Sequence, residues 1–211
     1  MILGITGCPG SGKSVLAKVI ASRGWMLIDA DLVGREVVEE DGDMRRELAR
    51  IFGRDILGKD GKLDRRLLAR KAFATHENTL KLNRVVHPVL VRRITEKIRD
   101  ERNAGTHAVV DCALIYEWGI EGLFDLVVCI RADESLRKKR LMERDGRSDE
   151  EVERMFSAQL PEPLKVLKAD IVLSNNDKPE SMVIYGLMLA DLPRYFREGG
   201  CIFLRSAPET A

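Results

Sequence analysis

The sequence has no closely spaced cysteine pair, no excess of charge of one sign and no long hydrophobic run. Its four cysteines stand far apart, at positions 8, 112, 129 and 201, which argues against a zinc site and against a disulfide framework. We therefore expect a reducing, cytoplasmic compartment. The 35 basic and 34 acidic residues nearly cancel, so the composition does not suggest a nucleic-acid partner or an anionic membrane surface.

Membrane and secretion signals are also missing from the sequence. No stretch of about 18 apolar residues predicts a membrane span, and the N-terminus lacks the basic start and apolar core of a signal peptide. The 211 residues are enough for one domain with a substantial core and a small appended subdomain. The tail after about residue 196 has one short apolar run, "CIFL", whose role the sequence does not indicate.

Short apolar runs alternate with helical patterns along most of the chain. Strands are predicted at "ILGIT", "WMLI", "HAVVDCALIY", "LFDLVVCI" and "DIVLS". Helices are predicted at "KSVLAKVIASRG", "DESLRKKRLMERDG", "SDEEVERMFSAQL" and "PESMVIYGLMLADL". The first helix is expected to place Val15, Val19 and Ile20 on one face, and the third opens with Ser148 and Glu151 in capping-box spacing. This alternation predicts an α/β fold with a mostly parallel sheet.

The region from about 32 to 104 has a different character. It is charged, leucine-spaced and mostly helical, with breaks at "EDGD", "GKDGKLD" and "HP". Pro88 is expected at the first position of a helix entered through His87. We interpret this block as an insertion between the second and third strands of the sheet.

The strongest local signal is "GITGCPGSGKS", which fits the pattern G-x-x-x-x-G-K-[ST] between a predicted strand and a predicted helix. Glycines let backbone N–H groups turn toward phosphate oxygens, and the helix N-terminus adds a favourable dipole. Lys13 is expected to reach the β- and γ-phosphates of a nucleotide, and the Ser14 hydroxyl to ligate Mg²⁺. A chance match in an ordinary glycine turn is the alternative, and the flanking strand and helix disfavour it. The expected ATP-binding loop consists of Cys8, Pro9, Gly10, Ser11, Gly12, Lys13, Ser14 and Val15.

"IDAD" places Asp29 and Asp31 at the predicted end of the second strand. If the strand continued, both carboxylates would point to one face, at the sheet edge where ligands bind in open α/β folds. A carboxylate there could accept the proton of an attacking hydroxyl and orient it toward the γ-phosphate. The alternative is that Asp31 caps a helix starting near Leu32. The spacing does not decide between these two interpretations.

Several segments together resemble the dephospho-CoA kinase family. The resemblance runs from residue 2 to about 190 and rests on "LGITGCPGSGKS", "IDADLVGREVVEE", "FGRDILGKDGKLDRRLLARKAF", "HPVLVRR", "LIYEWGIEGLFDLVVCI", "RLMERDG" and "ADIVLSNN". It implies a P-loop kinase: a parallel five-stranded sheet flanked by helices, with a helical acceptor-binding domain and a helical lid. The implied reaction uses ATP with Mg²⁺ and phosphorylates the ribose 3′-hydroxyl of dephospho-CoA, giving coenzyme A and ADP.

On the acceptor side, the resemblance implies that Asp31 is the catalytic base for the 3′-hydroxyl. It also implies that Arg35 binds the acceptor's phosphate or ribose, and that the block around His87 holds the pantetheine arm. For His87 the alternative is a residue that only enters a helix before Pro88, and the residues themselves favour ligand contact no more than that.

On the donor side, the resemblance implies that Arg140, in the lid, clamps the transferring phosphoryl group together with Lys13. A run such as "RKKRLMER" is usually a solvated helix face, but phosphoryl transfer needs mobile positive charge. Arg140 and Arg144 lie four residues apart, so either could serve, and we favour Arg140. Asn175 and Asn176 are implied to lie at the adenine end of ATP, whereas sequence alone would place them in a turn.

Two acidic residues and one thiol have less certain roles. Asp111 ends an apolar run and either holds a magnesium ion through one of its bound waters or serves a turn at the strand end. Glu117 matches an acidic position of the family, without a role that the sequence names. Pro9 supplies no N–H to phosphate. Cys8 stands beside a helix N-terminus, where raised thiolate character would let oxidation block ATP binding.

We expect residues 1–211 to form one kinase domain with three subregions. The nucleotide-binding core comprises 1–31, 105–132 and 169–195, the acceptor-binding insertion 32–104, and the lid 133–168. The expected partners are the small molecules ATP and dephospho-CoA, with no nucleic acid and no membrane, and the chain is expected to be a monomer or a weak homo-oligomer. A kinase for another small molecule and a nucleotide-dependent switch are the rival functions; "IDAD" favours a kinase over a switch, which needs no carboxylate base.

Overall fold

The computed structural model describes residues 1–58, 60–176 and 180–197, so Cys201 and the "CIFL" run lie outside the described residues. The chain divides into two compact units. The described residues of 1–28 and 98–197 form one, called here the core unit, and those of 29–97 form the other, the helical unit. The boundaries of the helical unit are close to the insertion expected at 32–104.

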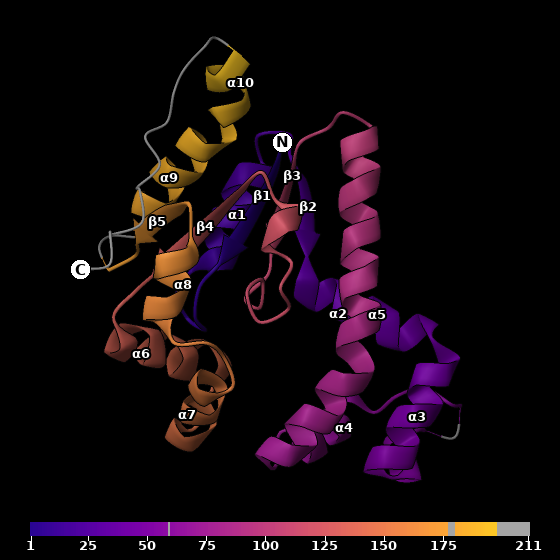
Figure 1. Ribbon diagram of the computed structural model, residues 1–211. Coiled ribbons are helices and arrows are strands. Elements are labelled where there is room, and N and C mark those ends of the chain that lie inside the picture. The colour runs from indigo at the N-terminus through magenta and orange to yellow at the C-terminus, as the bar shows by residue number, and fades with distance from the viewer. Residues whose placement is uncertain (59, 177–179, 198–211) are drawn as a thin grey trace, which may run out of the picture. The chain divides into compact units, whose positions relative to one another are not determined.

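One five-stranded sheet forms the centre of the core unit (Figure 1). Its strands are β1 (Ile2–Thr6), β2 (Met26–Asp29), β3 (Ala108–Asp111), β4 (Leu126–Arg131) and β5 (Ile171–Ser174), in the order β2-β3-β1-β4-β5. β1 pairs in parallel with β3 and with β4, and β4 pairs in parallel with β5. The carboxyl ends of these four strands therefore meet at one edge, where ligands bind in open α/β sheets.

All five predicted strands exist, but the third is shorter than expected. β3 ends at Asp111, and the rest of "HAVVDCALIY" forms turns before the short 3-10 helix η2 (Glu121–Leu123). Every residue of β1 and β3 is buried. Central strands buried on both faces are continuously apolar rather than alternating, which explains why these runs could be recognised in the sequence.

Helices α1 (Lys13–Ala21) and α9 (Glu180–Ala190) pack on each other in the core unit. The buried face of α1 contains Leu16, Ala17 and Ile20, whereas the side chain of Val15 is 51% exposed. The prediction that Val15 shares the apolar face of Val19 and Ile20 is therefore wrong. An added Cβ at Gly186 would lie 2.5 Å from Val19, so this glycine allows the close packing of the two helices.

Among its described residues the core unit also contains α6 (Glu134–Asp145), α7 (Asp149–Ser157), α8 (Glu162–Lys168) and α10 (Leu192–Arg197). α6 ends at Gly146, which adopts a left-handed conformation with φ 63°. The predicted capping box at the start of α7 is confirmed, because Ser148 and Glu151 each accept the other's backbone N–H.

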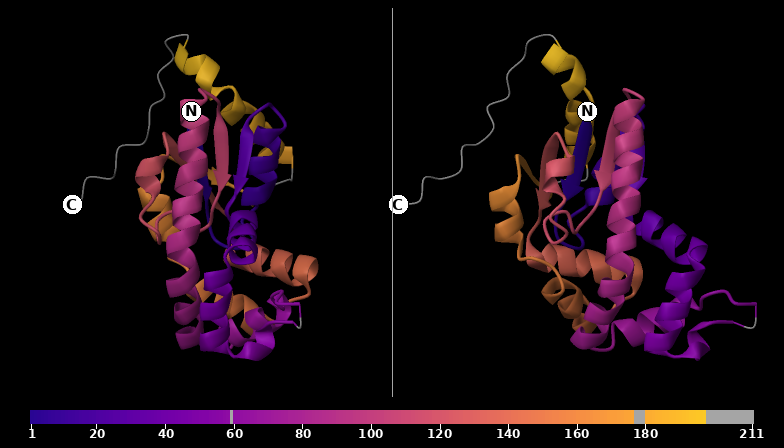
Figure 2. Two further views of the ribbon diagram at one scale, coloured as in Figure 1. Left: turned by 90° about the vertical axis from the view of Figure 1, so that its right-hand side faces the viewer. Right: turned by 45° about the vertical axis from the view of Figure 1, so that its right-hand side comes forward.

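The helical unit contains α2 (Ala30–Glu40), α3 (Gly42–Phe52), the 3-10 helix η1 (Arg54–Ile56), α4 (Arg65–Ala72) and most of α5 (His76–Asn103). α3 packs against α2 and α4 (Figure 2). η1 contacts both α3 and α4. The expectation that Pro88 starts a helix is wrong, because Pro88 lies inside α5. Proline cannot donate to the carbonyl of Arg84 and still remains within the 28-residue helix. Among residues 1–58, 60–176 and 180–197, no helix is both long and apolar enough to span a bilayer.

Candidate active site

The phosphate loop connects the carboxyl end of β1 with the N-terminus of α1. Gly12 is the N-cap of α1, with φ 101°, and provides no side chain for the first-turn N–H groups. The first turn also contains no acidic side chain that would compensate the helix dipole. A helix start of this kind leaves backbone donors and partial positive charge available for an anion.

Two glycines of the loop are required by their neighbours as well as by their positive φ values. A Cβ on Gly10 (φ 77°) would lie 2.6 Å from the carbonyl oxygen of Arg137 on α6. A Cβ on Gly12 would lie 2.3 Å from Nδ2 of Asn175. Both distances are far below ordinary carbon contacts, so the loop, α6 and Asn175 fit together only with glycine at these positions.

The loop is closed internally by hydrogen bonds to the carbonyl oxygen of Cys8. The backbone N–H of Ser11 donates to it at 3.2 Å, and Nζ of Lys13 donates to it at 3.2 Å. Ser14 and Val15 are exposed in the first turn of α1. The predicted loop therefore has the strand, turn and helix that its motif requires.

Arg140 of α6 contacts the phosphate loop directly. Its guanidinium donates to the carbonyl oxygen of Gly10 at 3.4 Å and to that of Asn175 at 3.0 Å. Arg144 instead donates twice to the carboxylate of Asp145, at 2.8 Å each, and its side chain is 69% exposed. Of the two arginines that the sequence left as candidates, Arg140 is thus the one beside the loop, and its clamping role remains a prediction.

Asn175 and Asn176, which follow β5, make contacts beyond those of a simple turn. Nδ2 of Asn175 donates to the carbonyl oxygen of Ser11 at 2.7 Å, and the Asn175 residue is 6% exposed. The amide of Asn176 exchanges two hydrogen bonds with Asp133, one from the Asp133 N–H and one to its carboxylate, both at 2.8 Å. Asn175 therefore braces the phosphate loop, and adenine contact remains a prediction.

The proposed reactivity of Cys8 is not supported by its surroundings. The residue is 5% exposed, and its Sγ donates to the carbonyl oxygen of Leu160 at 3.9 Å. Burial raises the pKa of the Cys8 thiol above its ordinary value, although Arg137 and Lys165 act in the opposite direction. The expectation of raised thiolate character is wrong, because burial outweighs the nearby cations.

Charged residues that the sequence did not single out surround the loop. Arg137, in the "RKKR" run interpreted as solvated, is 4% exposed; its Nε donates to the Ala132 carbonyl at 2.9 Å, and its guanidinium lies 4.6 Å from the Phe156 ring centre. Lys165 is fully buried and pairs with Glu117. A buried arginine and a buried lysine are rare unless paired, but no local sequence pattern distinguishes them from exposed ones.

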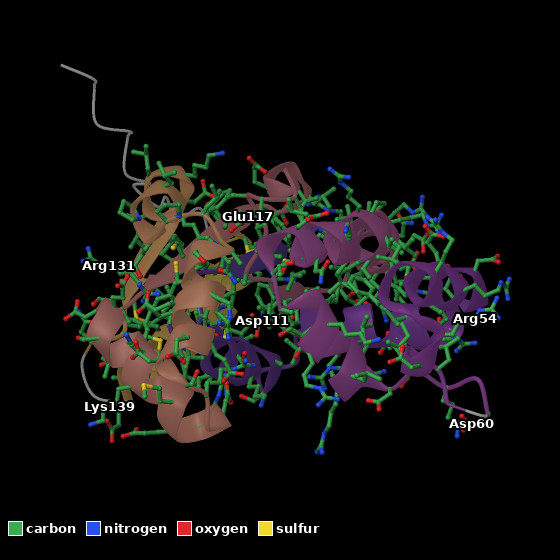
Figure 3. The ribbon with its side chains drawn as sticks, turned by 90° about the horizontal axis from the view of Figure 1, so that it is seen from below. Arg54, Asp60, Asp111, Glu117, Arg131 and Lys139 are labelled. Atoms are coloured by element: carbon green, nitrogen blue, oxygen red, sulfur yellow. The ribbon has the colours of Figure 1, made fainter. Side chains whose placement is uncertain are left out.

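Two carboxylates come from β3 and the segment that follows it (Figure 3). Asp111 ends β3 opposite Ile5 of β1 and is 8% exposed. Glu117 lies further along, in the turns before η2. Asp111 thus stands beside the strand that enters the phosphate loop, which is compatible with the magnesium role that the sequence left open.

The acceptor-side candidates belong to the helical unit. Asp29 is the N-cap of α2, and its carboxylate accepts the N–H groups of Asp31 at 2.9 Å and of Leu32 at 3.1 Å. Both interpretations of the "IDAD" segment are therefore corrected: the strand does not continue to Asp31, and Asp31 is not the cap. Asp31 and Arg35 are exposed and one helical turn apart on α2, and His87 is half-buried on α5. Burial lowers the pKa of His87.

Each unit contains a cavity among its described residues. In the core unit, a cavity of about 320 Å³ adjoins the phosphate loop at Cys8 and is lined further by Arg137, Phe156, Leu160 and Glu162, among others. In the helical unit, a cavity of about 490 Å³ lies between α2, α3 and α5 and is lined by residues including Val37, Glu40, Val89 and Arg92. Both are mixed in character, with charged and apolar walls.

A family model described as dephospho-CoA kinase matches residues 1–180. The chain belongs to the dephospho-CoA kinase family. A dephospho-CoA kinase from Corynebacterium glutamicum is 39% identical over 181 residues, which are 85% of this chain and 90% of that protein. The reaction of the family is ATP-dependent phosphorylation of dephospho-CoA, the last step of coenzyme A synthesis, and this is the activity of the chain.

Solved structures agree with this assignment at the level of the fold. The crystal structure of TT1252 from Thermus thermophilus has a TM-score of 0.72 and 35% identity, and the match covers 91% of this chain and 97% of that one. A dephospho-CoA kinase from Campylobacter jejuni has a TM-score of 0.69 at 22% identity, over 94% of this chain and 98% of that one. The family and the P-loop kinase fold inferred from the sequence are both confirmed.

Proposed function

We propose that the 3′-hydroxyl of dephospho-CoA attacks the γ-phosphate of ATP in line, and that Asp31 accepts the proton of that hydroxyl. A new phosphorus–oxygen bond forms to the ribose as the bond to ADP breaks. Lys13 and Arg140 balance the negative charge that spreads over the phosphoryl oxygens during transfer. The contact between Arg140 and Gly10 of the phosphate loop is the observation that best supports this arrangement.

Mg²⁺ supplies further charge neutralisation when bound with the nucleotide. In the described part of the chain, no three His, Cys, Asp or Glu side chains gather into a ready-made metal site. A nucleotide-bound Mg²⁺ needs only one or two protein oxygens besides its phosphates and waters. The Ser14 hydroxyl, and the Asp111 carboxylate directly or through water, are oxygen groups of the required kind near the loop.

The acceptor is proposed to bind to the helical unit. Arg35 is one turn after Asp31 on the exposed face of α2, so one helix face offers a base and a cation to the ribose and phosphate of the acceptor. The cavity lined by Val37, Val89 and Arg92 has the mixed apolar and polar walls that suit a pantetheine arm. His87 of α5 is proposed to contact the same substrate.

The proposed base is tested by coupled ADP release with ATP and Mg²⁺, with and without dephospho-CoA. We expect Asp31→Asn to lower acceptor-dependent turnover by about two orders of magnitude or more. Asp29→Asn is the matched control, because asparagine caps helices as well as aspartate does and turnover should stay near that of the parent. An Asp31→Asn variant as fast as the parent would remove Asp31 as the base while leaving the kinase activity intact.

The cytoplasmic location, the monomeric or weakly oligomeric state and the absence of a nucleic-acid partner remain proposals. The first rests on the scattered cysteines and the last on a formal net charge of +1. Sedimentation of the purified chain with and without nucleic acid tests the last two.

A further inference from the structure

A buried ion pair links two segments that lie beside the phosphate loop. Nζ of Lys165, on α8, is 2.8 Å from Oε1 of Glu117, and the two side chains are 0% and 17% exposed. Nζ also donates to the carbonyl oxygen of Ala113 at 2.6 Å and to Oε1 of Gln159 at 3.2 Å. An ammonium group has three N–H donors, so Lys165 has one acceptor for each. Ala113 and Glu117 follow β3, whereas Gln159 and Lys165 follow α7.

The pair is connected to the phosphate loop by one further hydrogen bond on the Lys165 side and by two in series on the Glu117 side. The Ala113 carbonyl also accepts the hydroxyl of Thr6 at 3.0 Å, and Thr6 is the last residue before the loop. Oε1 of Glu117 accepts the N–H of Leu160 at 2.9 Å, and the carbonyl of Leu160 accepts the Cys8 thiol at 3.9 Å. The start of the loop is therefore held both from the β3 side and from the α7–α8 joint.

The other end of α8 is connected to α6. Oε2 of Glu162 accepts the N–H of Ala132 at 3.2 Å and lies 3.6 Å from Nε of Arg137. Arg137 is one turn before Arg140, which contacts Gly10. α8 thus joins the lid helix that carries Arg140 to the segment after β3, and Lys165 is its buried attachment.

Stability alone does not account for a buried ion pair. Replacing such a pair by apolar side chains of similar volume is often neutral or stabilising, because burying two charges is costly. An ammonium group whose three N–H groups are all bonded does fix the relative positions of its acceptors, because each N–H group bonds to one acceptor in one geometry.

We propose that Glu117 and Lys165 are positioning residues for phosphoryl transfer. They hold the phosphate loop, α6 and the segment after α7 in one relative position. The γ-phosphate and Arg140 then meet in the reactive geometry. The inference rests on the proposed role of Arg140. It assigns Glu117 and Lys165 no contact with substrate.

The test compares Glu117→Gln, Lys165→Met and the double variant. Each single variant should lower the Tm, because a buried charge loses its partner. The double variant leaves no unpaired charge, so its Tm should return toward that of the parent. Its kcat should nevertheless stay at least about tenfold below the parent value, with the KM for ATP changed by less than about threefold, because transition-state geometry is lost rather than ground-state binding. A kcat that recovers together with the Tm would show a purely structural pair and overturn the proposal.

Two controls separate this proposal from the one on which it rests. Leu189→Ala creates a cavity in α9, away from the network, and should lower the Tm while kcat at 25 °C stays at the parent value. In an Arg140→Met background, the double substitution should have little further effect on kcat if the pair acts through Arg140. A full additional tenfold loss there would refute the positioning role. Parent-like activity of Arg140→Met itself would instead refute the proposed role of Arg140.

Discussion

Replacing Arg140 by methionine removes one guanidinium that lies against the phosphate loop and keeps most of the side chain's length. Arg140 donates to the carbonyls of Gly10 and Asn175, so its charge is held beside the loop that we propose to bind the phosphates of ATP. Loss of one such preorganised group costs about 2.7–4 kcal/mol in the transition state, which is about 10²–10³ in kcat. We expect a loss of this size in dephospho-CoA-dependent ADP release.

Arg144→Met is the matched control, because it removes the same charge from the same helix one turn later. Arg144 is paired with its neighbour Asp145 at the surface, and exposed pairs contribute about 0–1 kcal/mol. Its kcat should therefore stay within about twofold of the parent value, and both variants should keep the parent's circular dichroism. Equal losses in the two variants would refute the assignment of the clamp to Arg140. An Arg140→Met variant that changes only the KM for ATP would refute it as well, because Arg140 would then bind the ground state and the transition state equally.

Three other perturbations test separate parts of the structure. Gly12→Ala should abolish measurable ATP binding in calorimetry, because its Cβ would lie 2.3 Å from Nδ2 of Asn175; unchanged affinity would show that the loop can move aside. Iodoacetamide should label Cys8 more slowly than it labels free glutathione at pH 8, because burial raises the thiol's pKa; rapid labelling at that site, read by mass spectrometry, would contradict this. Burial lowers the pKa of His87, so the unfolded chain binds its proton first as the pH falls, and the stability present above about pH 6.5 is lost as the pH falls below that value. Urea midpoints should fall over that range more steeply for the parent than for His87→Asn, and equal slopes would exclude His87 as the source.

The features that the sequence predicted well are those whose cause is local. The phosphate loop needs glycines, a lysine and a hydroxyl, and all of these lie within one short stretch of the chain. The capping box at Ser148 is likewise complete within four residues. Strands β1 and β4 were visible because burial on both faces makes their sequences continuously apolar.

The predictions that failed depended on which of several local solutions the neighbours select. Pro88 suits a helix start, but the helical sequence on both sides carries α5 through it. Asp29 and Asp31 both suit an N-cap, and the end of β2 at Asp29 selects the first. Val15 belongs to an apolar run, yet α9 and the sheet cover the face of Leu16 and Ile20. In each case the local sequence is compatible with two structures, and tertiary packing selects one of them.

The buried charges around the phosphate loop show why a motif can reveal a site without revealing the residues that hold it in place. Arg137 reads in the sequence as a member of a solvated helix face, because its neighbours in "RKKR" are charged, and no local pattern marks Lys165 as buried. Their partners Glu162 and Glu117 lie 25 and 48 residues away in the chain, and only the parallel order β3-β1-β4 brings these segments to one sheet edge. A motif names the groups that touch phosphate, since these must be close in sequence to share one loop. The groups that hold the loop in place come from other strands, so their identity follows from the fold and not from the motif.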